Sequence, residues 1–195
     1  KGDIQTLIRE IKRLDKFITE FLDFSAPKGP DPSLCDIAGL MDETLVLLDK
    51  QITSNKIKVI KKMPKDVPNL LLDKDQMKQV FLNIIVNAME AMAQGGELEI
   101  MVTPALPGVY ARPTKSTKDK GPSTAKGVTI EFRDTGCGIP PDKLEKIFEP
   151  FFSFGKKGTG LGLSICNKIV QSHLGKIEIE SQLNQGTRVR IWLPV

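Results

Sequence analysis

The N-terminal segment carries apolar residues at alternating intervals of three and four. These residues are Ile4, Leu7, Ile11, Leu14, Ile18 and Phe21. This heptad seam predicts a helix over residues 3–24, and the seam needs a partner because an isolated helix of this length is marginal in water. A helix packed on its own domain is the alternative. Pro27, Gly29, Pro30 and Pro32 predict a stiff linker after the helix, which favours a separate partner.

The rest of the chain mixes helical and strand periodicities. Helices are predicted over Ile37–Ser54, residues 74–94 and residues 160–173. Gly95-Gly96 would end the second of them. Strands are predicted over residues 58–63, 69–73, 97–103, 127–134, 176–181 and 187–193. The order helix, strands, helix, hairpin, helix, hairpin predicts an α+β fold. We expect a two-layer α/β sandwich of a mixed, mostly antiparallel sheet against helices, not a doubly wound parallel sheet.

Composition narrows the class of protein. The 195 residues allow one full domain plus an appendage, and a net charge of +4 with one Trp and one Tyr does not indicate nucleic-acid binding. Residues 104–126 have no hydrophobic period and predict a mobile insertion. Cys35, Cys137 and Cys166 fit neither a disulfide framework nor a zinc site, which favours a reducing compartment. No apolar run reaches the ~18 residues of a membrane span, no signal peptide opens the chain, and its start at Lys1 suggests a fragment.

Two asparagines stand in an apolar helical run. Asn83 and Asn87 are four residues apart, so both amides project from one helix face. Asn is a poor residue inside a helix, and its carbonyl oxygen is a suitable ligand for Mg²⁺. Taken alone, the pair fits better with two side chains that bond a neighbouring loop.

Two glycine-containing segments follow. The first is Asp134-Thr135-Gly136-Cys137-Gly138-Ile139, in which a strand-end carboxylate is expected to accept a hydrogen bond from the exocyclic amine of adenine. An ordinary turn is the alternative. The second is Gly158-Thr159-Gly160-Leu161-Gly162-Leu163, which opens a helix whose free N–H groups favour phosphate. A flexible glycine loop is its alternative. The Walker and protein-kinase glycine patterns are absent from the sequence.

In order and spacing, these segments resemble the ATP-binding domain of sensor histidine kinases, within the family shared with gyrase, the ninety-kilodalton heat-shock chaperones and MutL. Residues 83–88 resemble the N box, 134–139 the first glycine box, 148–152 the F box and 158–163 the second glycine box. Residues 1–27 resemble the second helix of a dimerisation and phosphotransfer hairpin, and residues 22–27 its ending in the nitrogen-regulation-like subgroup. The resemblance makes residues 28–33 a linker and 34–195 the catalytic domain, with an ATP lid over residues 153–159.

The resemblance implies a role for each matching residue. Asn87 would ligate Mg²⁺, Asn83 would support the phosphates and metal-bound water, and Asp134 would bind adenine. Phe148 would belong to the aromatic cluster that anchors the lid. The remaining nucleotide contacts would come from Gly136, Gly138, Ile139, Gly158, Thr159, Gly160, Leu161, Gly162 and Leu163.

The sequence departs from the family pattern at three places. Glu90 stands where many members have a basic residue. Residues 153–157 replace the usual lid sequence, so either Lys156 or Lys157 is the candidate for the γ-phosphate. Residues 104–126 lengthen a hairpin that is usually shorter. His173, the one histidine, lies near a helix end where the family often has a structural histidine, and we expect no phosphoacceptor role for it.

The leading hypothesis is therefore the ATP half of a bacterial histidine kinase in two-component signalling. It would bind Mg-ATP and donate the γ-phosphate to a histidine on a helix that this fragment lacks, so it would not phosphorylate itself. A response regulator receiver domain and a second copy, joined through the hairpin, would be its partners. A cytoplasmic location is expected, with the full-length protein open to membrane anchoring but no membrane contact by the fragment. A non-catalytic nucleotide-binding module and a gyrase-like or chaperone ATPase are the alternatives, and Asn83, in the position of the gyrase-like water-activating Glu, disfavours the latter.

Overall fold

The computed structural model describes residues 29–64, 66–105, 126–153 and 158–195, together with six single positions near the N-terminus. Those positions are helical and exposed, and they are Ile11, Leu14, Ile18, Phe21, Leu22 and Ser25. The remainder of the predicted heptad helix, nearly all of the insertion over residues 104–126, and both Lys156 and Lys157 lie outside the described residues.

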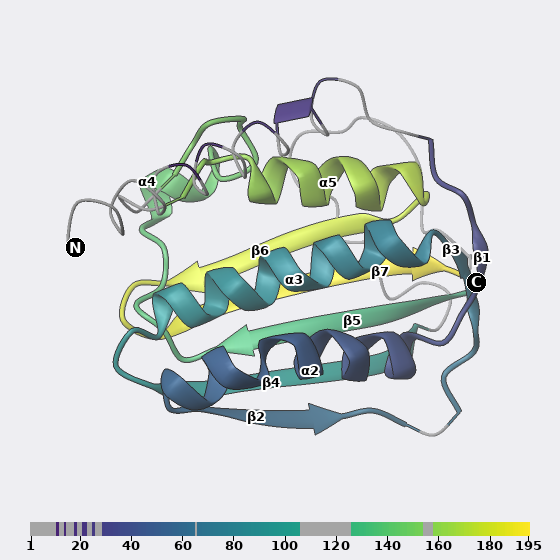
Figure 1. The fold of residues 1–195 in the computed structure, drawn as a ribbon, viewed down its shortest axis with the longest axis horizontal. Coiled ribbons are helices and arrows are strands. Elements are labelled where there is room, and N and C mark those ends of the chain that lie inside the picture. The colour runs from purple at the N-terminus through teal and green to yellow at the C-terminus, as the bar shows by residue number, and fades with distance from the viewer. Residues whose placement is uncertain are drawn as a thin grey trace.

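A five-stranded sheet forms one layer of the domain (Figure 1). Its strands, in spatial order, are β2 (Ile57–Lys62), β4 (Gly96–Ala105), β5 (Gly127–Asp134), β7 (Gly186–Pro194) and β6 (Lys176–Gln182). The β2–β4 pair is parallel and the other pairs are antiparallel. The predicted mixed and mostly antiparallel sheet is therefore confirmed.

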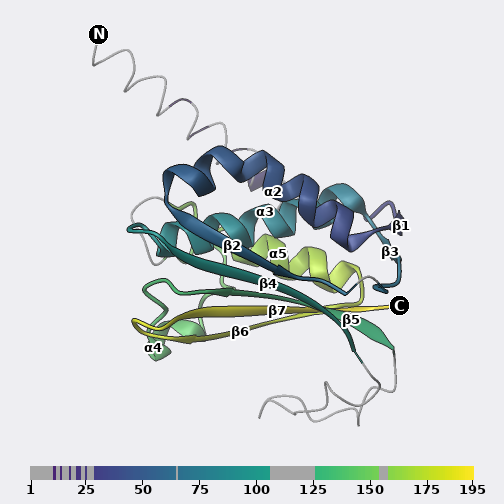
Figure 2. The same cartoon turned by 90° about the horizontal axis from the view of Figure 1, so that it is seen from below.

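Three helices form the second layer and cover one face of this sheet (Figure 2). They are α2 (Ile37–Ser54), α3 (Lys74–Ala91) and α5 (Gly162–Ser172), and a short helix α4 (Pro141–Leu144) lies between β5 and α5 in sequence. Alternation along the strands turns one side chain in two toward the helices. On β5, for example, Val128, Ile130 and Phe132 are buried, and Phe132 packs against Phe81 of α3 with ring centroids 5.8 Å apart. The predicted two-layer sandwich is confirmed.

The glycines set element boundaries that differ from the predicted ones. Helix α3 ends at Ala91 instead of residue 94, because Gly95 has a φ of +93° and its N–H closes a turn on the Met92 carbonyl. Helix α5 begins at Gly162 instead of residue 160, because Gly160 has a φ of +74°, outside the right-handed helical region. A two-stranded antiparallel sheet of β1 (Ser33–Cys35) and β3 (Leu70–Leu72) joins the segment before α2 to the segment before α3.

Candidate functional site

The two asparagines lie on α3, which turns its apolar side toward the sheet. Val80, Phe81, Ile84, Ile85 and Ala88 are buried, whereas Asn83 is half-buried and Asn87 is exposed. A Cβ built on Gly162 would lie 3.7 Å from Asn83 Cγ, so the first turn of α5 faces the amide of Asn83 across the α3–α5 contact. The fold therefore brings together two segments that lie about eighty residues apart in the sequence.

Cys166 of α5 also contributes to the contact between α5 and α3. Its buried thiol donates a long hydrogen bond to the Val80 carbonyl, with an S···O distance of 3.8 Å. Burial raises the pKa of Cys166 to about 12, although a hydrogen bond with the Asn83 side chain lowers it. The thiol therefore stays protonated and acts as a packing group between α3 and α5.

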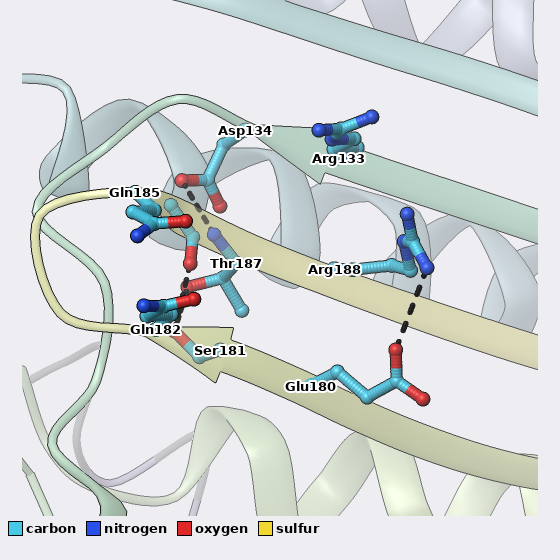
Figure 3. A pocket seen from close by; sticks show the side chains of 9 residues that line it. Arg133, Asp134, Glu180, Ser181, Gln182, Gln185, Thr187 and Arg188 are labelled. Atoms are coloured by element: carbon cyan, nitrogen blue, oxygen red, sulfur yellow. Dashed lines mark hydrogen bonds and ion pairs between the residues drawn. The ribbon is translucent and has the colours of Figure 1, made fainter.

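Asp134 ends β5 with its carboxylate buried (6% exposed). Its Oδ1 accepts a hydrogen bond from the N–H group of Gly136 at 2.8 Å. It also accepts one from the N–H group of Thr187 at 3.2 Å (Figure 3). Burial raises the pKa of Asp134 above its ordinary value, against the lowering effect of these two bonds. Both bonds use Oδ1, and Oδ2 makes no hydrogen bond with the described residues. The carboxylate thus retains acceptor capacity that a ligand N–H group can use.

The glycines of residues 134–139 allow the loop to dock closely on its neighbours. Gly138 has a φ of +68°, and a Cβ there would lie 2.1 Å from the Gln182 carbonyl oxygen. A Cβ on Gly136 would lie 2.7 Å from Ala91 at the end of α3. The N–H of Cys137 also donates to the Ala91 carbonyl at 3.1 Å. Glycine is required here for close packing of the loop that follows Asp134.

The second glycine segment leads into α5. Leu161 is the N-cap of the helix and makes no side-chain capping bond, whereas its own N–H donates a hydrogen bond to Thr159 Oγ1 at 3.3 Å. The first N–H groups of a helix have no partner within the helix, and the macrodipole favours an anion beside them. A Cβ on Gly160 would lie 2.4 Å from the carbonyl carbon of Phe151, so this segment packs tightly on the F-box region.

The aromatic cluster of residues 148–152 contributes unequally to the core. Phe148 packs against the core, whereas Phe151 is 55% exposed and has a φ of +67°. The predicted role of this cluster in anchoring the lid stays a prediction. Lys156 and Lys157 lie outside the described residues, so their predicted phosphate contact stays a prediction.

A shallow cavity of about 270 Å³ opens beside Asp134 (Figure 3). Asp134, Gly186 and Thr187 line it together with side chains of the sheet face that no helix covers, including Arg133 and Arg188. Asn83, Asn87 and residues 158–163 do not line it. The cavity is therefore a hollow behind Asp134 and does not unite the predicted site residues.

Two residues that the sequence reasoning did not single out support Asp134. Thr187 donates its N–H to the carboxylate, and its hydroxyl lies 2.9 Å from Ser181 Oγ. Ser181 Oγ also accepts the Ile139 N–H at 2.8 Å. The sequence gives only a weak indication of the role of Thr187, since a hydroxyl residue after a turn glycine such as Gly186 is common in hairpins.

His173 is buried at the C-terminal end of α5. Its Nε2 accepts a hydrogen bond from the Asp73 N–H at 2.9 Å, and its Nδ1 lies 2.8 Å from the Ile169 carbonyl. Because the Asp73 N–H group can only donate, Nε2 carries no hydrogen, and Nδ1 donates its hydrogen to the Ile169 carbonyl. Both ring nitrogens are thus engaged inside the fold, as the predicted structural role requires.

Residues 72–195 match the family model described as Histidine kinase-, DNA gyrase B-, and HSP90-like ATPase. The chain belongs to this ATPase family. The match spans all four boxes, and ATP is the nucleotide that the description of the family implies. Among the described residues, no helix is long and apolar enough to cross a membrane.

Curated and solved relatives of this ATPase domain are histidine kinases. Sporulation kinase E of Bacillus subtilis (strain 168) is 33% identical over 186 residues, which are 95% of this chain and 23% of the relative. The catalytic domain of histidine kinase ThkA superposes with a TM-score of 0.69 at 28% identity, covering 84% of this chain and 95% of that domain. ThkA in complex with the response regulator TrrA gives 0.76 at 26% identity, covering all of this chain and 51% of that one. The chain thus corresponds to the catalytic ATP-binding domain of such kinases and spans only part of their length.

Proposed function

We propose that this ATPase domain binds Mg-ATP and donates the γ-phosphate to a histidine on a dimerisation helix outside this fragment. The single observation that supports the proposal best is the juxtaposition of Asn83 with the first turn of α5. Amide oxygens and unpaired helix N–H groups there suit a metal-bound phosphate chain. Phosphoryl transfer relies chiefly on positioning and charge neutralisation, so the domain needs no nucleophile of its own.

Each part of ATP has a matching group in the described residues. Asp134 would accept a hydrogen bond from the exocyclic amine of adenine, and the glycines of residues 134–139 would let the base lie against the backbone. The N-terminus of α5 and the second glycine segment would hold the phosphates. Asn87 is exposed and would ligate Mg²⁺ together with phosphate oxygens, while Asn83 would support phosphate and metal-bound water. Mg²⁺ would neutralise charge on the transferred phosphoryl group.

The acceptor histidine would come from another segment. His173 is buried (7% exposed), and its two nitrogens bond Asp73 and Ile169, so it offers no lone pair to an incoming phosphoryl group. An acceptor on a dimerisation helix would fit the exposed apolar positions Ile11, Leu14, Ile18 and Phe21, which suit pairing with a second hairpin helix. We infer a homodimer through this seam, with a response regulator receiver domain as the phosphoryl acceptor downstream, the kind of partner with which ThkA was solved.

The binding step is tested by calorimetric titration of the chain with ATP, with and without Mg²⁺. We expect saturable binding that Mg²⁺ strengthens, and an Asn87→Ala variant that loses most of the Mg²⁺ effect while it keeps its thermal melting temperature. Asn87 is exposed, so this change removes a ligand without opening a cavity in the core. Equal affinity with and without Mg²⁺ would contradict the assigned metal role.

A gyrase-like ATPase is the second candidate, because the family description includes DNA gyrase B. Such an enzyme needs a base that activates water. The position one turn before Asn87 holds the neutral amide of Asn83, which cannot take a proton at ordinary pH. Steady release of phosphate by the isolated chain would favour this second candidate over transfer to histidine.

A further inference from the structure

The linker is tied to the start of α3 by one backbone hydrogen bond. The N–H of Asp31 donates to Asp73 Oδ2 at 2.9 Å. Asp73 is also the N-cap of α3, since its Oδ1 accepts the N–H groups of Asp75 and Gln76, each at 3.0 Å. One carboxylate therefore bonds the linker with one oxygen and caps the helix with the other.

The same residue is tied to the end of α5 through its main chain. The Asp73 N–H donates to Nε2 of the buried His173 at 2.9 Å, and these residues are one hundred positions apart in the sequence. His173 is the C-cap of α5, and its Nδ1 is anchored on the Ile169 carbonyl. Loss of the imidazole would remove the acceptor of the part-buried Asp73 N–H, which costs free energy.

The helices α3 and α5, which are joined at this end, carry the proposed nucleotide-binding residues Asn83 and Gly162 farther along their lengths. Asn83 lies ten residues along α3 from Asp73, and His173 lies eleven residues along α5 from Gly162. At a rise of 1.5 Å per residue, the two paths are about 15 and about 17 Å long. Between the two ends the helices pack directly, as the contact from Cys166 to Val80 illustrates. A shift of one helix at the Asp73 end therefore changes the spacing between Asn83 and Gly162.

We propose that Asp73 and His173 are positioning residues that couple the described linker residues 29–33 to the nucleotide site. The coupling rests on the proposed function, because it assigns Asn83 and Gly162 to nucleotide binding. With the bond from Asp31 in place, α3 is held at a fixed position against α5. Without it, the start of α3 keeps the bond to His173, the β1–β3 pairing and the contacts of Lys74 and Lys78 with Glu43. It loses its bond to the linker, and the Asn83–Gly162 spacing relaxes. A displacement of the linker would thereby reach the ATP site through α3.

Matched variants separate this coupling from general destabilisation. Asp31→Pro removes the N–H donor, whereas Asp31→Ala keeps it and removes only an exposed side chain. Asp73→Asn keeps an oxygen and a good N-cap while it loses one carboxylate acceptor. His173→Gln retains an acceptor for the Asp73 N–H, and His173→Phe does not. Each variant is compared with wild type by its melting temperature, its Mg-ATP dissociation constant, and the NMR resonances of the Asn83 and Asn87 side-chain amides without nucleotide.

We expect Asp31→Pro and Asp73→Asn to shift the Asn83 amide resonances in the same direction and to weaken Mg-ATP binding three- to tenfold. Asp31→Ala should match wild type, and His173→Gln should bind more tightly than His173→Phe. Unmoved Asn83 resonances in Asp31→Pro, or equal effects of Asp31→Ala and Asp31→Pro, would overturn the coupling. If wild type itself failed to bind Mg-ATP, the proposed function would fall, and the amide resonances would still decide the coupling on their own.

Discussion

Gly162 at the start of α5 faces the side-chain amide of Asn83 on α3, with space for a Cβ at 3.7 Å from Asn83 Cγ. Glycine is not needed at this position for folding, since its φ lies outside the left-handed region and an added Cβ would make only ordinary van der Waals contacts with Asn83, at 3.7–4.0 Å. The small side chain instead keeps the backbone accessible beside Asn83, where a phosphate would bind.

Gly162→Ala should therefore separate nucleotide binding from stability. The new methyl group makes ordinary van der Waals contacts, and Ala favours the helix over Gly, so the melting temperature should stay level or rise. Mg-ATP binding should weaken about tenfold, or about 1.4 kcal/mol, because the methyl group narrows the approach to the helix N–H groups. Calorimetry and thermal melting of the same samples provide the check. Unchanged affinity would show that phosphate does not bind here.

Asp134→Asn should weaken the choice of adenine. The amide oxygen can still accept hydrogen bonds from the N–H groups of Gly136 and Thr187. The side-chain NH₂ group then faces the ligand, so a donor replaces the acceptor that adenine needs. Losing a hydrogen bond to a charged group costs about 1.5–3 kcal/mol, so ATP affinity should fall by about ten- to a hundredfold. GTP affinity should change less, and the ATP-to-GTP ratio measured by competition should fall. An unchanged ratio would remove Asp134 from the adenine site.

Gly138→Ala should destabilise the fold itself. A methyl group there would lie 2.1 Å from the Gln182 carbonyl oxygen, and the φ of +68° adds strain of about 1–3 kcal/mol. The free energy of unfolding in urea should drop by more than about 2 kcal/mol. Gly29→Ala is the matched control, because nothing lies within 4 Å of its added Cβ, and its stability should equal that of wild type.

Glu43 should titrate far below an ordinary glutamate. Hydrogen bonds from Lys74 and Lys78, at 2.8 and 2.9 Å, lower its pKa from 4.5 to about 2. Because the folded pKa lies below the unfolded one, Glu43 stabilises the protein above about pH 4.5, and this stabilisation is lost as the pH falls toward 2. The difference in stability between wild type and Glu43→Gln should shrink over that range and at high salt. A carboxyl ¹³C titration midpoint near 4.5 would contradict the lysine contacts.

Local patterns in the sequence predict most elements of this domain. The helices that become α2, α3 and α5 and the strands β4 to β7 follow from periodicity, because each buries one face against the other layer. The boxes of residues 83–88, 134–139 and 158–163 likewise predict which segments meet. The meeting of Gly162 with Asn83, and of Gly136 with Ala91 at the end of α3, is a consequence of the order of these elements in a two-layer sandwich.

Long-range pairings explain what the sequence does not predict. The parallel pairing of β2 with β4 and the pairing of β1 with β3 depend on contacts between distant segments. The strand that becomes β3 is predicted over residues 69–73, whereas β1 is too short to show a period. The hydrogen bond between Asp73 and His173 joins a main-chain group to a side chain, so no residue type at position 73 signals it. Thr187 supports Asp134 through its backbone N–H for the same reason.

The most direct measurement is phosphotransfer in trans from Mg-ATP labelled at the γ-phosphate. The chain is incubated with a separately expressed dimerisation hairpin that carries the acceptor histidine, beside the Asn87→Ala variant as control. We predict acid-labile phosphohistidine on the hairpin, dependent on Mg²⁺ and on Asn87, with no label on His173. Binding of ATP without any transfer to the hairpin, or stable label on His173 of the chain, would contradict the proposed histidine kinase activity.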